Sequence, residues 1–349
     1  MHSISRLLLG TVVLTIGAAT LAGCGAQQEQ GSGFAPQHAD GALARSLVAA
    51  MFRRHALPPN VDRAASWVSP AAKHKDLVYL SNGGTGDVTI FSYPTMQAVG
   101  ELTGFSDPAG VCSDPKGNVW VVSSLSTKVA EYAHGHRKPV AKLNDDDATY
   151  PLACAVDPTT GNLVVTDLGN PTGGGAVLLY TDAKGSPEIL SSSAMSFVYF
   201  AAYDSSGNLF VDGEDKNYNF VLMELPVGGS QFETISLSGT IDFPGGIEWD
   251  GQYVAVGDQA YEGGHTSVID DVSVSGSTGT IAATVALTQS CDVTQFAIVP
   301  GSSSTVVAPD VCLNDAFVYA YPGGGDPTNT VTGLQYPFAA ALSVVHGTR

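Results

Sequence analysis

Short apolar runs separated by polar turns recur along the chain from about residue 105. The fullest copies are DPAGVCSDPKGNVWVVS at 107–123, YPLACAVDPTTGNLVVTD at 150–167 and FVYFAAYDSSGNLFVDG at 197–213. In each, an apolar run leads to an Asp, a Gly-Asn turn and a second apolar run, which predicts two antiparallel strands joined by a tight turn. Less complete copies follow at 243–258, 292–310 and 336–345. A regular spacing of 43 to 49 residues indicates an internal structural repeat.

Each repeat predicts four strands, which we expect in the second copy at 153–156, 163–166, 176–180 and 188–190. A four-stranded unit of this length repeated around a ring is a β-propeller blade. The last copy supplies an innermost strand alone, whereas residues 76–103 supply three strands without one. We therefore predict an all-β, six-bladed propeller over residues 73–349. Its C-terminal strand completes the first blade, which removes exposed sheet edges.

The N-terminus predicts export and lipid attachment. Arg6 precedes an apolar stretch that ends in Leu-Ala-Gly-Cys, which resembles a lipobox, so residues 1–23 are a signal peptide and Cys24 carries the acyl chains. Residues 24–72 then hold a flexible tether and a short helix at 42–55. This helix either packs on the domain or lies on the membrane. Gly25 after the Cys favours the outer membrane if the host has one.

The amino-acid composition limits the classes of partner that we expect the protein to bind. The 349 residues include 15 Lys and Arg against 33 Asp and Glu, a formal net charge of -18, while 44% hydrophobic content is enough for a sizeable core. An acid excess of this size repels phosphate backbones and anionic lipid surfaces, so we expect no nucleic-acid partner. We expect a monomer in the extracytoplasmic envelope.

Four cysteines remain after lipidation of Cys24, an even number that suits an oxidising compartment. Three pairings are possible. Cys291 and Cys312 lie symmetrically about the 301–302 turn, which makes them cross-strand neighbours in a regular hairpin. Cys112 and Cys154 occupy innermost strands of consecutive blades. We predict the Cys291–Cys312 bridge first and the Cys112–Cys154 bridge second.

The motif P-x-G-x-x-x-D…G-N-h-h-V-x-D, over about residues 75–345, resembles NHL-repeat propellers and the gluconolactonase-like and virginiamycin-lyase-like families. The resemblance to the gluconolactonase-like families implies a central divalent metal held by an early Glu with Asn and Asp residues. Here the Asn82-Gly83-Gly84 loop occupies the place of that Glu. The resemblance to the virginiamycin-lyase-like families implies a catalytic His, whereas His134 and His136 fall in a turn between outer strands. The catalytic residues, if any, are therefore not identified.

Five polar residues close the second strand of their blades and are candidates for a ring at the channel mouth: Asn82, Asp167, Asp212, Asp258 and Asp310. Hard cations such as calcium take six to eight oxygen ligands, which such a ring can offer. The alternative is that these residues cap loops and keep the protein soluble.

The sequence is compatible with three functions. We favour a membrane-tethered binding or scaffold module for a protein or glycan. The alternatives are a metal-dependent hydrolase or lyase similar to the gluconolactonase-like families, and a structural lipoprotein of an envelope assembly.

Overall fold

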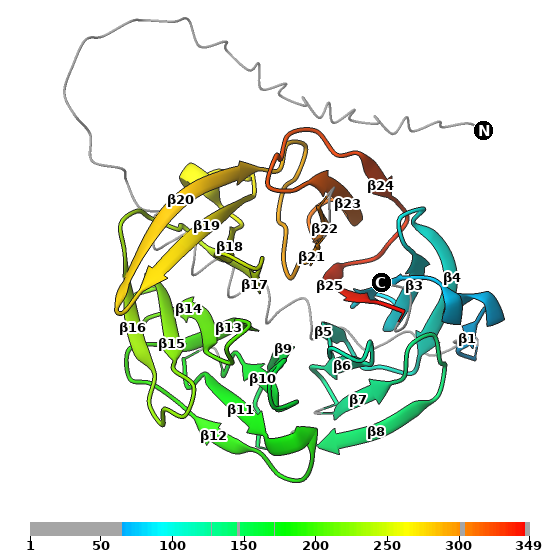
Figure 1. Ribbon diagram of the computed structural model, residues 1–349, viewed down its shortest axis with the longest axis horizontal. Helices are drawn as coiled ribbons and strands as arrows, with labels where there is room; N and C mark the ends of the chain where they lie inside the picture. Colours follow the sequence, from blue (N-terminus) through cyan, green and yellow to red (C-terminus); the bar gives the residue numbers. More distant parts are fainter. Residues whose placement is uncertain (1–64, 127, 145–146, 171, 301–303, 346–349) are drawn as a thin grey trace, which may run out of the picture. The chain divides into compact units, whose positions relative to one another are not determined.

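The computed structural model describes residues 65–345 except 127, 145–146, 171 and 301–303 (Figure 1). The predicted signal peptide, Cys24 and the predicted helix at 42–55 lie outside the described residues. Regular structure in the described part is almost entirely β, with three short 3-10 helices: η1 (Pro70–His74), η2 (Thr181–Ala183) and η3 (Tyr261–Gly263). None of the helices described there is long and apolar enough to cross a membrane.

The first sheet joins the two ends of the described chain. Its order is β1-β4-β3-β2-β25. The strands are β1 (Trp67–Val68), β2 (Leu77–Asn82), β3 (Asp87–Ser92), β4 (Gln97–Thr103) and β25 (Pro337–Ser343). The C-terminal strand β25 pairs antiparallel with β2, from Leu77↔Ser343 to Asn82↔Pro337, which is the closure that the repeat pattern predicts.

Three further sheets are four-stranded antiparallel meanders. One contains β5 (Pro108–Ser113), β6 (Val119–Ser123), β7 (Lys128–Tyr132) and β8 (Pro139–Asn144). The next contains β9 (Pro151–Val156), β10 (Leu163–Asp167), β11 (Ala176–Tyr180) and β12 (Glu188–Leu190), close to the four strands expected for the second copy. The third contains β21 (Ala297–Val299), β22 (Thr305–Asp310), β23 (Asp315–Ala320) and β24 (Asn329–Val331).

The remaining sheet has eight strands and differs from the expected separate blades. One meander comprises β13 (Phe197–Tyr203), β14 (Leu209–Glu214), β15 (Phe220–Leu225) and β16 (Glu233–Leu237). The other comprises β17 (Pro244–Trp249), β18 (Val254–Asp258), β19 (Val268–Ser275) and β20 (Thr278–Ala286). A parallel pairing of β16 with β20, limited to two residue pairs, joins them. The join forms because β19 and β20 have eight and nine residues, whereas every other described strand has at most seven.

The fold is therefore all-β, a propeller-like arrangement of small antiparallel sheets (Figure 1). The first strand of each meander, together with β25, lies innermost: β25 contacts β5 and β21, and β5, β9, β13 and β17 contact one another in turn. A Cβ on Gly110 in β5 would lie 2.6 Å from the Cα of Ala153, so only glycine allows β5 and β9 to approach this closely. The buried rings of Phe200 in β13 and Phe338 in β25 stack 6.0 Å apart, so innermost strands of non-adjacent sheets share one core.

The turns between the innermost and second strands explain the recurring Asp. The carboxylates of Asp114, Asp157, Asp204 and Asp250 each accept the backbone N–H two residues further on. The glycines that complete these turns have positive φ, between 78° and 103°. The sequence motif is thus a self-capped turn, as expected.

Both predicted disulfides are present. Cys112–Cys154 links β5 to β9 with a Cα–Cα distance of 5.6 Å, and Cys291–Cys312 has a Cα–Cα distance of 5.8 Å. The second bridge lies just beyond the paired strands β21 and β22, in register with the isolated pair Val293↔Asp310. Two disulfides indicate an extracytoplasmic location.

Candidate functional site

Three of the five predicted ring residues each accept several hydrogen bonds from backbone N–H groups of the segments next to their strands. The second-strand carboxylates of Asp167 and Asp258 each receive two N–H groups from the segment entering the innermost strand, and one from the residue two positions on. The carboxylate of Asp310 receives the N–H groups of Cys291, Asp292, Cys312 and Leu313 at 2.6–3.3 Å. These bonds fix the loop that carries the chain from one sheet into the next.

The other two ring residues have different surroundings. Asp212 is fully buried; one oxygen accepts the N–H of Phe200 at 2.9 Å, and Oδ2 finds no partner among the described residues. Burial raises the pKa of Asp212 well above its usual range. Two residues on, burial raises the pKa of Glu214 to about 7, although the hydroxyl of Tyr199 donates to it at 2.9 Å. Asn82 donates to Asp87 and Thr89 within its own hairpin.

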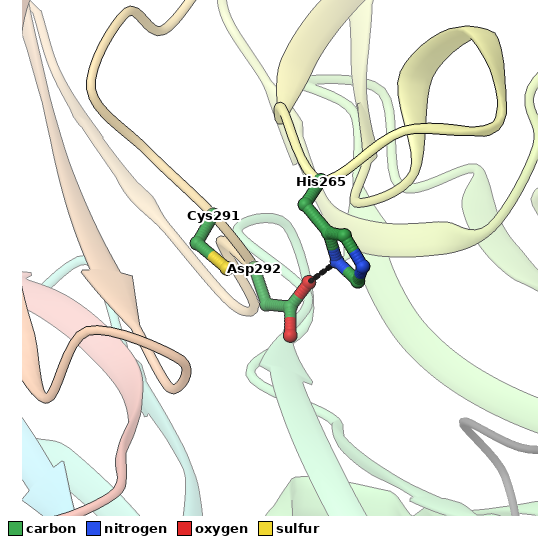
Figure 2. Close-up of side chains that lie close together, drawn as sticks. All are labelled: His265, Cys291 and Asp292. Carbon is green, nitrogen blue, oxygen red and sulfur yellow. Dashed lines mark ion pairs between the residues drawn. The ribbon is translucent and has the colours of Figure 1, made fainter. Parts of the chain in front are cut away.

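The structure does not bring the five together as one ligand set. Within the described part of the chain, His, Cys, Asp and Glu ligand atoms lie within 4.8 Å of one another in threes as His265, Cys291 and Asp292, and as Cys291, Asp310 and Cys312. Neither group contains two of the five ring residues. Figure 2 shows the first group, in which His265 Nδ1 lies 4.0 Å from Asp292 Oδ1. Both groups include sulfur held in the Cys291–Cys312 disulfide, which leaves no thiolate to bind a metal.

The calcium ring stays a prediction, and the observed bonds favour its alternative, the capping of loops. The sequence carries a further signal for that role. Ser123 ends β6, where the other copies have Asp, and its hydroxyl both accepts from the N–H and donates to the carbonyl of Ser106. A serine can replace the carboxylate only if the position serves hydrogen bonding to the backbone rather than charge.

A central cavity of about 430 Å³ opens at the end of the ring where the innermost strands meet their turns. Its wall takes residues from every innermost strand, among them Cys112, Ala155, Ala202, Glu248, Ile298 and Leu342. The acidic turn residues Asp114, Asp204 and Asp250 also line it. A second cavity of about 470 Å³ lies along the outer strands β15 and β16, where Asp242 is the one carboxylate of its lining. The central cavity is the better candidate because polar groups from several strands converge there.

Glu248 is the most perturbed acid of the cavity wall. Its Oε2 accepts the N–H of Ile298 at 2.5 Å, which ties β17 to β21. Burial raises the pKa of Glu248 to about 8, against the opposing effect of that hydrogen bond. At neutral pH the side chain is therefore mostly a neutral carboxylic acid, which can donate a hydrogen bond.

Two neighbours add unpaired polar atoms. Nε1 of Trp249 and Oε1 of Gln295 are buried and have no hydrogen-bond partner in the described part of the chain. The amide nitrogen of Gln295 donates to the carbonyl of Val111 at 2.9 Å, which fixes the orientation of the side chain. A buried polar group without a hydrogen bond costs about 1–3 kcal/mol of free energy. A bound polar molecule that pairs with these atoms would therefore be stabilised in the cavity.

Glu248, Trp249 and Gln295 are not among the residues predicted from the sequence. A signal was present, because the equivalent position in the three preceding copies holds the small residues Cys112, Ala155 and Ala202. A Glu at an innermost-strand position that otherwise carries a small side chain points to a special environment. The predicted ring residues lie at the opposite end of the strands.

Comparisons with known proteins reveal structural likeness in the fold. No protein-family model matches the chain, and no curated protein matches it. A chain of the nidogen/laminin complex superposes with a TM-score of 0.62 at 11% identity, over 78% of this chain and 100% of that chain. Two proteins of unknown function, from Desulfotomaculum acetoxidans and Bacteroides caccae, give TM-scores of 0.57 and 0.54 at 13% identity, each over 77% of this chain and 99% of theirs. These likenesses support the propeller fold and that alone.

Proposed function

We propose that the protein is a lipid-anchored, extracytoplasmic and monomeric six-bladed propeller that binds a glycan in its central cavity. The observation that carries the proposal is the convergence in one cavity wall of Glu248, whose pKa burial raises to about 8, with the unpartnered polar atoms of Trp249 and Gln295. A hydroxyl-rich ligand is both a donor and an acceptor, so it suits a neutral acid, an indole N–H and an amide oxygen together. The volume of about 430 Å³ lies within the range of small-molecule sites.

The six-blade count rests on treating the eight-stranded sheet as two blades. Both of its halves are antiparallel meanders of four strands, and their first strands β13 and β17 pack side by side like the other innermost strands. The pairing between them covers Ser236↔Thr278 and Leu237↔Gly279 alone. A contact this short supports two blades touching at their rims.

The anchor rests on the Leu-Ala-Gly-Cys signal at 21–24, and it has its own test. The wild-type protein is expected in the membrane fraction, whereas a chain that begins at Gly25 behind an ordinary cleaved export signal is expected in the soluble envelope fraction. Detergent-free washing that leaves the second protein on the membrane would contradict the lipid anchor.

Ligand binding is tested on an array of neutral glycans at pH 6 with the mature chain. Glu248→Leu removes the polar group and should lower the affinity for any bound glycan at least about tenfold, as loss of a buried hydrogen bond implies. Glu233→Leu, at an exposed position of β16, is the matched control and should bind as the wild type does. Equal binding by all three proteins would place the glycan outside the cavity. Failure of every glycan, with capture of an envelope protein that Glu248→Leu abolishes, would instead favour a protein ligand at the same cavity.

A further inference from the structure

Charge is distributed unevenly along this acidic chain. Residues 65–142 carry seven Lys and Arg against six Asp and Glu, whereas residues 143–345 carry two against 24. The first of these parts spans the first two sheets apart from β25, and in Figure 1 these sheets lie on the opposite side of the ring from β19 and β20. The acidic excess of the described chain therefore lies outside the first two sheets, which are close to neutral as a whole.

Exposed basic side chains line a groove between these two sheets. A cavity of about 330 Å³ is lined by the segment Val68–Pro70, by Lys73 and by the turn from Gly135 to Lys138. Lys73, Arg137 and Lys138 are exposed, and among the described residues no carboxylate lies within 4.0 Å of their charged groups. Arg137 donates to the carbonyl of Ser66 at 3.4 Å, which joins the turn to the start of the first sheet.

Exposed apolar side chains accompany the charges. Trp67 on β1 is 45% exposed and Val140 on β8 is 60% exposed, next to Lys138 and Lys142. Exposed tryptophan and aliphatic side chains beside lysine and arginine are typical of surfaces that meet the lipid headgroup region. We call Trp67, Lys73, Arg137, Lys138, Val140 and Lys142 the basic rim.

The position of the basic rim in the chain selects its partner. Trp67 is two residues from Ala65, where the described chain begins, and the 41 residues before it lead back to the predicted acylated Cys24. Along the sequence, Trp67 is therefore the part of the basic rim closest to the predicted anchor. If the anchor is present, this edge is the one joined to the tether, and it carries exposed basic side chains that suit anionic headgroups.

We propose that the basic rim docks on a bilayer surface rich in anionic phospholipid. The formal net charge of -18 does not prevent this contact, because screening at physiological salt acts over about 8 Å and the surface responds to nearby charge. Glu101, opposite Trp67 in the β1–β4 pair, and Glu131, opposite Ala141 in the β7–β8 pair, add two carboxylates to this region. The rim supplies four basic residues against them. The proposal rests on the proposed anchor for its geometry, whereas its test needs no acyl chain.

The test measures co-sedimentation of the mature, non-acylated chain with vesicles of phosphatidylglycerol and phosphatidylcholine in equal amounts, and with vesicles of phosphatidylcholine alone. This chain keeps every described strand and both disulfides. Binding is expected to the mixed vesicles and to weaken as salt rises. Each basic residue near an anionic surface contributes roughly fivefold to partitioning, so Lys73→Glu with Lys138→Glu should lower the partition coefficient by at least about tenfold.

The chain offers a matched control in Lys184→Glu with Lys216→Glu, which makes the same change in net charge on other sheets. This pair should stay within about twofold of the wild type. Equal losses for both double variants, equal binding to both kinds of vesicle, or binding to heparin without binding to vesicles would each overturn the proposal. Loss of glycan binding in Glu248→Leu is a separate result, so the two proposals can fail independently.

Discussion

Replacing Glu248 by Gln tests the electrostatic state of the central cavity without changing its shape. The amide oxygen of Gln can still accept the N–H of Ile298, and the substitution removes the ionisable group alone. We expect the variant to resemble the wild type in acid and to become the more stable protein in alkali.

The magnitude follows from the pKa. Burial raises the pKa of Glu248 from 4.5 to about 8, so its stabilising effect is complete below about pH 4.5 and is lost as the pH rises towards 8. Each pH unit in that window costs about 1.4 kcal/mol of unfolding free energy, because the unfolded chain releases the proton first. Between pH 5 and pH 9 the wild type should therefore lose about 4 kcal/mol relative to Glu248→Gln.

The assay is urea unfolding of both proteins at pH 5, 7 and 9 with the disulfides intact. Taking the difference between the two proteins cancels the titration of other buried acids, such as Glu214 and Asp258, whose pKa values burial also raises. A difference in unfolding free energy that stays constant from pH 5 to pH 9 would refute a protonated Glu248.

Further predictions concern the fold. Replacing Cys291 and Cys312 by Ser should lower the unfolding free energy by about 3 kcal/mol, since the bridge closes a loop with a sequence separation of 21; an unchanged midpoint in urea would contradict this. Deleting residues 334–349 removes β25 and leaves β2 with a free edge, so light scattering should detect association; a monomeric, equally stable truncation would argue against the closed ring. Asp310→Ala leaves four backbone N–H groups without their acceptor and should cost about 3 kcal/mol or more, whereas EDTA should leave the wild-type melting temperature unchanged; a marked fall in EDTA would restore the calcium ring.

Local chemistry made much of the fold predictable. The Asp-Gly-Asn turns and the alternating apolar runs specify hairpins on their own, so β9 to β12 lie close to where the sequence places them. The positions of Cys112 and Cys154 on neighbouring innermost strands follow from the repeat. By contrast, β1 has two residues and no apolar run to reveal it. The eight-stranded sheet depends on how far β19 and β20 extend across space, which no local pattern encodes.

The site was harder to predict because its hydrogen-bond partners and its burial depend on residues far apart in the sequence. Asp167, Asp258 and Asp310 end their second strands as predicted, whereas Asp212 lies two residues before the end of β14. The partners of Asp167 and Asp258 include backbone N–H groups of a loop that returns from the previous sheet. That loop is brought to Asp167 and Asp258 by register, and the sequence of the strand does not reveal it. The environment of Glu248 likewise depends on Ile298, 50 residues away.

The most direct test of the central claim is a crystal structure of the mature protein purified from its own envelope, at a resolution that shows bound molecules. We expect density for a hydroxyl-rich ligand in the central cavity, hydrogen-bonded to Glu248 and to Trp249 or Gln295. A cavity that holds ordered water alone, with the ligand bound at another face of the ring, would contradict it.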